Sequence, residues 1–189
     1  MVFFSLEEVK VKVYLISGKS RHGKDTTGDF IQKEYERRGK KVCRSQISKY
    51  LKIYVKDYFG WDGREESKPR TLLQQLGTDI IREKLNKPRF FIDRTIEDIE
   101  ILSNFFDVMI ITDIRLPLEI TAIKERFDDV VSVNIKRINF ESPLTDKQQK
   151  HKIENAMDNF NGYDYKVTND TLDKLNIDAI NIVEREEEK

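Results

Sequence analysis

The stretch "YLISGKSRHGKDTTGDFI", from Tyr14 to Ile31, runs from an apolar segment through a glycine-bounded loop into a segment with helical spacing. Its centre follows the pattern Gly-x-x-x-x-Gly-Lys, with Gly18, Gly23 and Lys24 at the defining positions. Such a loop between a strand and a helix binds phosphate, because backbone N–H groups and the helix N-terminus face the same point. The stretch therefore predicts a phosphate-binding loop (P-loop), in which we expect Lys24 to be exposed before a nucleotide binds.

Asp25 occupies the position at which this loop normally carries Ser or Thr. The usual hydroxyl helps to hold Mg²⁺, and a carboxylate is also a hard oxygen ligand for that ion. The alternative is a helix-start role, because Asp is favoured in the first turn of a helix. We favour the metal role and expect Asp25→Ser to keep much of the metal dependence that Asp25→Ala loses. The nucleotide-binding residues expected from this loop are Gly18, Arg21, His22, Gly23, Lys24, Asp25, Thr26 and Thr27.

A second apolar run, "DVMIITD" from Asp107 to Asp113, predicts a buried strand with an acid at its carboxyl end. This pattern is typical of the Walker B strand, whose acid holds Mg²⁺, although an Asp in this place also serves as a turn residue. Arg115 follows two residues later and could neutralise charge on a transferring phosphoryl group. Its alternative is an ion pair with Glu119, four residues on. We expect Asp25 and Asp113 to be metal ligands, and Lys24, Asp113 and Arg115 to be catalytic.

Strand-like and helix-like segments alternate along the chain. Strands are expected at 11–17, near 42, and at 107–113, 129–137 and 163–170; helices are expected at 25–38, 47–60, 70–84, 90–105, 117–127, 151–160 and 171–185. This alternation predicts an α/β fold of the P-loop NTPase type, with a parallel five-stranded sheet and helices on both faces.

The 189 residues are expected to form one domain, 1–189. We expect a core at about 11–45 and 106–185, a helical acceptor-binding insertion at about 46–105, and a lid at about 137–152. A lid of this kind would close over the nucleotide and exclude water from the reaction.

Lys plus Arg and Asp plus Glu number 34 each, so no charge excess points to nucleic acid or a membrane. The single Cys43 cannot form an internal disulfide, and we favour a packing role for it in a reducing compartment. Charged residues interrupt the N-terminal segment 1–17, which argues against a signal peptide. No stretch reaches the ~20 apolar residues that cross a bilayer. The expected location is cytoplasmic.

Two P-loop classes do not fit the sequence. The guanine-specificity motif Asn-Lys-x-Asp is not found, because "NKPR" at Asn86 carries Arg89 where Asp is required. The chain is also short for an AAA+ module with its helical lid domain. A compact kinase remains.

The stretch "SGKSRHGKDTTGDFI" resembles the loop of the phage-type deoxynucleoside monophosphate kinases, in which Gly-Lys-Asp-Thr replaces Gly-Lys-Ser-Thr. Animal phosphomevalonate kinase is similar at Gly-Lys-Asp. The resemblance to the phage-type family continues through "PRTLLQQLGTDIIRE", "MIITDIRLPLEI" and "HKIENAMDNFNGYDYKVTNDTLDKL", and covers about 11–175. It implies that the P-loop residues bind a triphosphate, that Asp113 binds the metal, and that the acceptor lies on the inserted helices.

Arg70, Gln74 and Arg82 are the acceptor-site candidates on the inserted helices. Arg70 and Gln74 share one helix face, and an arginine fork can bind two phosphate oxygens at once. Ion pairs of these arginines with Asp79 or Glu83 are the alternative. For three further residues two roles are open: Trp61 stacks on a base or packs at a hinge, Arg137 stacks on adenine or contacts phosphates, and His151 belongs to the site or is a solvated lid residue.

We therefore expect an ATP-dependent phosphotransferase that uses ATP and Mg²⁺ and acts on a small phosphorylated acceptor, with a (deoxy)nucleoside monophosphate favoured. Dephospho-coenzyme A and phosphomevalonate are alternative acceptors. A nucleotide-binding regulatory module without transfer activity is the alternative of another class. No nucleic-acid or membrane partner is expected, and a homodimer is left open.

Overall fold

The computed structural model describes residues 11–142 and 144–189, so the expectation about a signal peptide lies partly outside the described residues. Five strands form one parallel sheet in the order β2-β3-β1-β4-β5. The strands are β1 Lys12–Ser17, β2 Val42–Ser45, β3 Val108–Ile114, β4 Val130–Arg137 and β5 Tyr165–Asn169. The predicted α/β fold with a parallel five-stranded sheet is confirmed.

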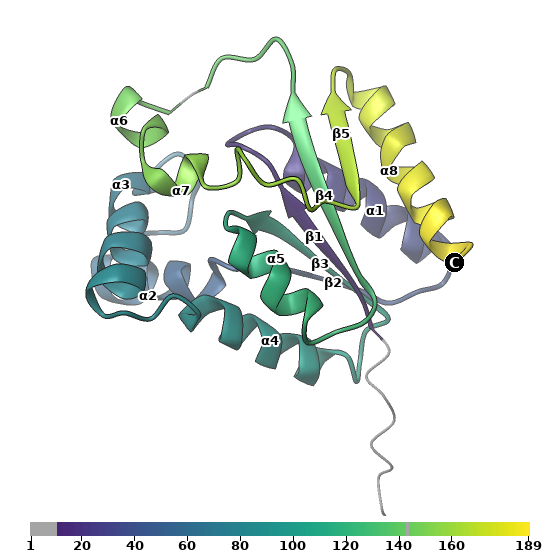
Figure 1. Cartoon of the computed structure of the whole chain (residues 1–189), viewed down its shortest axis with the longest axis horizontal. Helices are drawn as coiled ribbons and strands as arrows, with labels where there is room; N and C mark the ends of the chain where they lie inside the picture. Colours follow the sequence, from purple (N-terminus) through teal and green to yellow (C-terminus); the bar gives the residue numbers. More distant parts are fainter. Residues whose placement is uncertain (1–10, 143) are drawn as a thin grey trace, which may run out of the picture.

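Helices cover both faces of this sheet (Figure 1). They are α1 Lys24–Arg37, α2 Lys49–Phe59, α3 Arg70–Gln74, the π-helix η1 Gln75–Lys84, α4 Phe90–Leu102, α5 Pro117–Lys124, α6 Asp146–Gln149, α7 Lys152–Asn155 and α8 Leu172–Glu187. Helices α1 and α8 pack on one face, and α4 and α5 pack on the other (Figure 1).

The alternation of side chains along β1 explains why the sheet is buried on both faces. Val13 and Leu15 point into a cluster with α2, α4 and α5, whereas Tyr14 and Ile16 point into a second cluster with α1 and α8. All four are fully buried. Cys43 is half-buried and packs against the first cluster, in agreement with the packing role favoured for it.

Because the strands are parallel, the loops after β1, β3 and β4 leave the sheet at the same edge. Helices α2 to α4 lie between β2 and β3 in the chain and form a helical insertion. Helices α6 and α7, here called the lid segment, follow β4 and lie beside α3 (Figure 1). The Gln74 amide donates to the main-chain oxygen of Gln148 at 3.4 Å, and Lys152 forms an ion pair with Glu83. The lid segment therefore rests on the insertion.

Three segments differ from the sequence-based expectation. The predicted helix 70–84 becomes π-helical from Gln75, with hydrogen bonds such as Leu85 N to Ile80 O at 2.8 Å. The predicted helix 151–160 is reduced to the short α7, and the predicted lid at about 137–152 contains the short helix α6.

The last helix runs to Glu187 and so exceeds its predicted end at residue 185. Buried Glu186 anchors its last turn, because the Tyr165 hydroxyl donates to Glu186 at 2.5 Å. None of the helices formed by residues 11–142 and 144–189 has the length and apolar composition that a membrane span requires.

Candidate functional site

The loop between β1 and α1 needs glycine at both ends. Gly18 and Gly23 have φ angles of 149° and 99°, which L side chains rarely adopt. A Cβ at Gly18 would collide with the main-chain oxygen of Ile135, and one at Gly23 would lie 2.6 Å from Asn169 Nδ2. The main chain of the loop is therefore tightly packed against β4 and β5.

The Lys24 side chain folds back onto the loop between β1 and α1. Its Nζ donates to the main-chain oxygen of Lys19 at 2.8 Å, and the side chain is only 8% exposed. The expectation that Lys24 is exposed is wrong, because the ammonium folds back onto the loop it belongs to. Burial, with the nearby charge of Arg115, lowers the pKa of Lys24 to about 8. A bound anion would compensate for this loss of solvation.

Two other predicted loop residues support the backbone. Thr27 is fully buried and its hydroxyl donates to the main-chain oxygen of Gly23 at 2.9 Å. The main-chain oxygen of His22 accepts from the Asn169 amide at 2.9 Å, and its Nδ1 accepts from Arg137 N at 3.2 Å. Thr27 and His22 thus hold the loop in shape.

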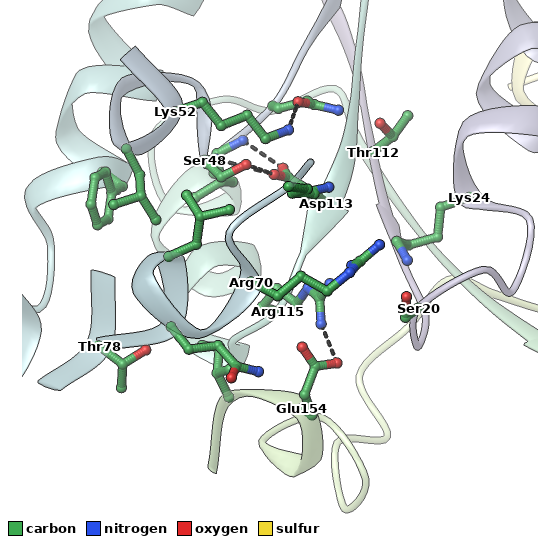
Figure 2. Close-up of a pocket in the computed structure, with 18 of the residues that line it drawn as sticks. Ser20, Lys24, Ser48, Lys52, Arg70, Thr78, Thr112, Asp113, Arg115 and Glu154 are labelled. Atoms are coloured by element: carbon green, nitrogen blue, oxygen red, sulfur yellow. Dashed lines mark hydrogen bonds and ion pairs between the residues drawn. The ribbon is translucent and has the colours of Figure 1, made fainter. Parts of the chain in front are cut away.

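A cavity of about 270 Å³ extends from the P-loop, including Ser20 and Arg21, to the insertion and the lid segment. The cationic side chains that line it are Arg21, Lys24, Lys52, Lys68, Arg70, Arg82 and Arg115. The carboxylates are Asp25, Glu65, Asp113, Glu119 and Glu154. The apolar side chains are Ile47, Leu51, Leu73, Phe91, Leu144 and Ile153. Figure 2 shows Lys24, Arg70, Asp113 and Arg115 around one space.

The two predicted metal ligands have different surroundings. The Thr112 hydroxyl donates to Asp25 Oδ1 at 2.5 Å, so Asp25 is joined to β3 through the residue before Asp113. Asp113 accepts from Ile47 N at 2.6 Å and Ser48 N at 3.1 Å, and also from the Ser48 hydroxyl. Asp113 therefore fixes the start of α2. Thr26 is half-buried beside Asp25 in the first turn of α1.

The Arg115 side chain does not form the ion pair with Glu119 that was the alternative to its catalytic role. Its guanidinium pairs with Glu154 in α7, whereas Glu119 accepts from the main-chain N of Arg115 at 2.7 Å and of Leu116 at 3.0 Å. The two residues four positions apart do meet, but through the main chain of Arg115, because Glu119 lies in the first turn of α5 and caps that helix. Arg115 is thus linked to the lid segment, as Figure 2 shows.

Arg82 pairs with Glu119 in the wall of the cavity. Its Nη2 lies 3.2 Å from Glu119 Oε1, Nη1 donates to Gly77 O at 3.0 Å, and the guanidinium lies over the Phe91 ring at 4.9 Å. Glu119 is fully buried, and burial raises its pKa to about 7 against the opposing influence of Arg82. The alternative pairing of Arg82 with Asp79 or Glu83 is wrong.

Arg70 and Gln74 reach the cavity from α3. Arg70 pairs with Glu65 in the preceding loop and not with Asp79 or Glu83, which contact the lid segment instead. Since this acid is half-exposed, the pair can open at little cost.

The structure does not bring Trp61 or Arg137 to this cavity. The Trp61 indole donates to Arg64 O at 3.1 Å, with Lys56 Nζ 5.7 Å from its ring, which matches the packing alternative. The guanidinium of Arg137 lies over Phe140 at 4.7 Å and is exposed. His151 caps α7, because its Nδ1 accepts from Ile153 N at 3.3 Å.

Sequence reasoning missed several residues of the site. Lys52 lies one turn after Ser48 in α2 and reaches the Gln46 amide oxygen inside the cavity, where burial lowers its pKa. A lysine flanked by the buried positions Leu51 and Val55 is a signal that could have identified it. The other polar lining residues that were missed are Ser20, Gln46, Ser48, Glu65, Lys68, Thr78, Thr112 and Glu154.

The parallel sheet, the helices on both faces and the loop between β1 and α1 define an α/β protein with the P-loop NTPase fold. No family model matches the chain, and no curated protein matches its sequence. Among solved structures it is similar to a mutant of the APS kinase CysC from Mycobacterium tuberculosis, with 11% identity, 93% of this chain and 98% of that chain covered, and a TM-score of 0.46. It is also similar to shikimate kinase from Aquifex aeolicus, with 14% identity, coverage of 93% and 97%, and a TM-score of 0.48. Neither likeness bears on which reaction this chain performs.

Proposed function

We propose that the chain is an ATP-dependent phosphotransferase that transfers the γ-phosphoryl group to a small phosphorylated acceptor, with a (deoxy)nucleoside monophosphate as the favoured acceptor. One observation carries the proposal. A single cavity joins Lys24 of the P-loop to the cations Lys52, Arg70 and Arg82 of the insertion. Cations from the P-loop and from the insertion in one cavity fit a donor triphosphate and an acceptor phosphate that must meet.

The P-loop end of the cavity fits the nucleotide and its metal. The loop precedes the N-terminus of α1, so the phosphates would be bound by main-chain N–H groups and by Lys24. Asp25 and Thr112 offer hard oxygen atoms of the kind that Mg²⁺ prefers, directly or through water. When bound, Mg²⁺ would neutralise the negative charge of the β- and γ-phosphates.

The insertion end fits a phosphorylated acceptor. Arg70 can exchange its half-exposed partner Glu65 for a phosphate, and its planar fork suits two phosphate oxygens. Lys52 supplies a second charge whose lowered pKa reflects burial, which a bound phosphate would compensate. Leu51, Leu73 and Phe91 supply apolar contacts for the rest of the acceptor. A nucleoside monophosphate combines these requirements, since it joins a phosphate to a flat, partly apolar base.

Catalysis would then consist of positioning and charge neutralisation, without a covalent intermediate. Lys24 and Arg115 neutralise the transferring group. Asp113 acts indirectly, because it fixes the start of α2 and hence the helix that carries Lys52. The lid segment excludes water by resting on α3 and η1 through Gln148, His151 and Lys152.

Product identification tests this proposal. The protein is incubated with ATP labelled in the γ-phosphate, Mg²⁺ and each nucleoside monophosphate in turn, and the products are separated and analysed by mass spectrometry. We expect the label in a nucleoside diphosphate. Label that appears only as inorganic phosphate would contradict transfer. In parallel reactions with dephospho-coenzyme A or phosphomevalonate, label in coenzyme A or in diphosphomevalonate would contradict the favoured acceptor alone.

A further inference from the structure

Asp25 and Thr112 pair a carboxylate from the loop with a hydroxyl from β3, the reverse of the usual origins of these two groups. In P-loop NTPases a hydroxyl from the loop and a carboxylate from the neighbouring strand hold Mg²⁺. Here the loop supplies the carboxylate of Asp25, and β3 supplies the hydroxyl of Thr112, which donates to Asp25 Oδ1 at 2.5 Å. The two groups are the same as in the usual pair, but each comes from the other element.

Asp113, the acid predicted from the β3 pattern, belongs to the opposite side of the strand. Successive side chains of a strand point to opposite faces, so Thr112 and Asp113 cannot both face Asp25. Thr112 contacts Asp25, whereas Asp113 accepts from the main-chain N of Ile47 and of Ser48 and from the Ser48 hydroxyl. Three donors at the start of α2 therefore engage both carboxylate oxygens of Asp113.

The Asp25 carboxylate, in contrast, is accessible. Its side chain is 70% exposed and borders both the main cavity and an open groove of about 520 Å³. The nearest cation in the described part of the chain, Arg44, lies 3.8 Å from Asp25 Oδ1 and makes its close contact with Asp29 at 2.5 Å. Thr112 is 2% exposed, so its hydroxyl is held in place beneath Asp25. A hydrated cation has room beside Asp25 and a fixed partner orients that carboxylate.

We propose that Asp25 is the protein ligand of the nucleotide-bound Mg²⁺, that Thr112 orients it, and that Asp113 is a positioning residue for α2 and not a metal ligand. This inference rests on the proposed function, because the metal is taken to arrive with ATP. It reverses the expectation drawn from the sequence for Asp25→Ser. A serine at this position would face Thr112, which leaves two hydroxyls and no carboxylate.

The test measures ATP binding and not turnover. The dissociation constant of ATP is determined by calorimetry in excess Mg²⁺ and in EDTA. The constant in EDTA divided by the constant in Mg²⁺ gives the factor by which the metal strengthens ATP binding. In Asp25→Ser and in Thr112→Val we expect this ratio to fall by about tenfold or more, the usual effect of losing a ligand or its orienting partner. Asp113→Asn should keep the ratio of the unmodified protein.

The double variant Asp25→Ser/Thr112→Asp restores the usual arrangement of hydroxyl and carboxylate. If circular dichroism shows that it folds, its ratio should exceed that of Asp25→Ser alone. An unchanged ratio in Asp25→Ser, or a loss confined to Asp113→Asn, would overturn the inference. A failure of the unmodified protein to bind ATP under either condition would instead contradict the proposed function, and the inference would fall with it.

Discussion

Arg115, which directly follows β3, forms an ion pair with Glu154 in helix α7. The Glu154 side chain is 10% exposed, so the pair lies mostly out of solvent and connects the sheet edge with the lid segment. Arg115 is also close enough to Lys24 to lower the pKa of that lysine. Under the proposed function, the same guanidinium would either hold the lid segment or neutralise a phosphoryl group beside Lys24.

These two roles of Arg115 can be separated by substitution. Arg115→Ala should lower kcat by about 10²–10³-fold, because a charge that stabilises the transferring group is lost. Glu154→Gln should lower kcat far less, since Arg115 keeps its charge and loses only its lid partner. Steady-state kinetics on both variants provides the comparison. Equal losses in the two variants would mean that the ion pair acts only through the lid segment.

Lys24 should take up a proton when ATP binds. Its pKa is lowered to about 8 in the empty loop, so at pH 8.5 the unprotonated form is the larger fraction. Phosphate oxygens favour the ammonium form and raise this pKa, which draws a proton from solution. Calorimetry of ATP binding at pH 8.5 in buffers of different ionisation enthalpy should therefore show proton uptake. The matched control is Lys24→Arg, which stays protonated; uptake of equal size in that variant would assign the proton to another group.

Arg70 and Arg82 should respond differently to truncation. Arg70→Ala removes a phosphate contact of ~1.5–3 kcal/mol and should raise the acceptor KM by roughly ten- to hundredfold, with little change in the ATP KM. The free energy of unfolding of the Arg70→Ala variant should barely change, because the lost partner Glu65 is half-exposed. Arg82→Ala leaves Glu119 buried without its partner and should lower the free energy of unfolding by ~3–5 kcal/mol at pH 8.

Denaturant titrations and acceptor kinetics on both arginine variants test this difference. The double variant Arg82→Ala/Glu119→Gln serves as the control, since it removes the buried charge and should recover part of the stability. An unchanged acceptor KM in Arg70→Ala would move the acceptor phosphate away from α3.

Glu119 should make stability depend on pH. Burial raises its pKa from 4.5 to about 7, so between these values the folded state binds more protons than the unfolded state. The contribution of Glu119 to stability is therefore present at pH 4.5 and is lost as pH rises to 7. As pH rises from 4.5 to 7, the unmodified protein should therefore lose unfolding free energy relative to Glu119→Gln. A difference that stays constant from pH 4.5 to 7 would show that Glu119 does not titrate there.

The sequence predicted the sheet and the P-loop because their signals are local. The apolar runs that became β1 and β3 are continuous, and Gly18 and Gly23 occupy positions of positive φ that L side chains rarely adopt. One local signal was overlooked: Thr145 and Gln148 form a capping box, a pattern that predicts the start of α6.

The side-chain partners in the site could not be predicted in the same way. Asp113 and Ser48 are 65 positions apart, Arg115 and Glu154 are 39 apart, and Arg82 and Glu119 are 37 apart. Thr112 and Asp113 at the end of β3 point to opposite faces of the sheet, and the sequence does not tell which of them faces the P-loop and which faces α2. The strand pattern "IITD" favoured Asp113, and the structure joins Thr112 to Asp25 instead.

The central claim is phosphoryl transfer from ATP to a small phosphorylated acceptor, and a coupled ADP-release assay tests it most directly. The acceptors compared are the nucleoside monophosphates, dephospho-coenzyme A and phosphomevalonate, each with Mg²⁺ and ATP. Lys24→Ala is the matched control, because it keeps the cavity and removes the ammonium that contacts Lys19 O. The account predicts acceptor-dependent ADP release that is highest in kcat/KM for a nucleoside monophosphate and absent in Lys24→Ala. ATP binding without acceptor-dependent ADP release for any of these compounds would contradict it.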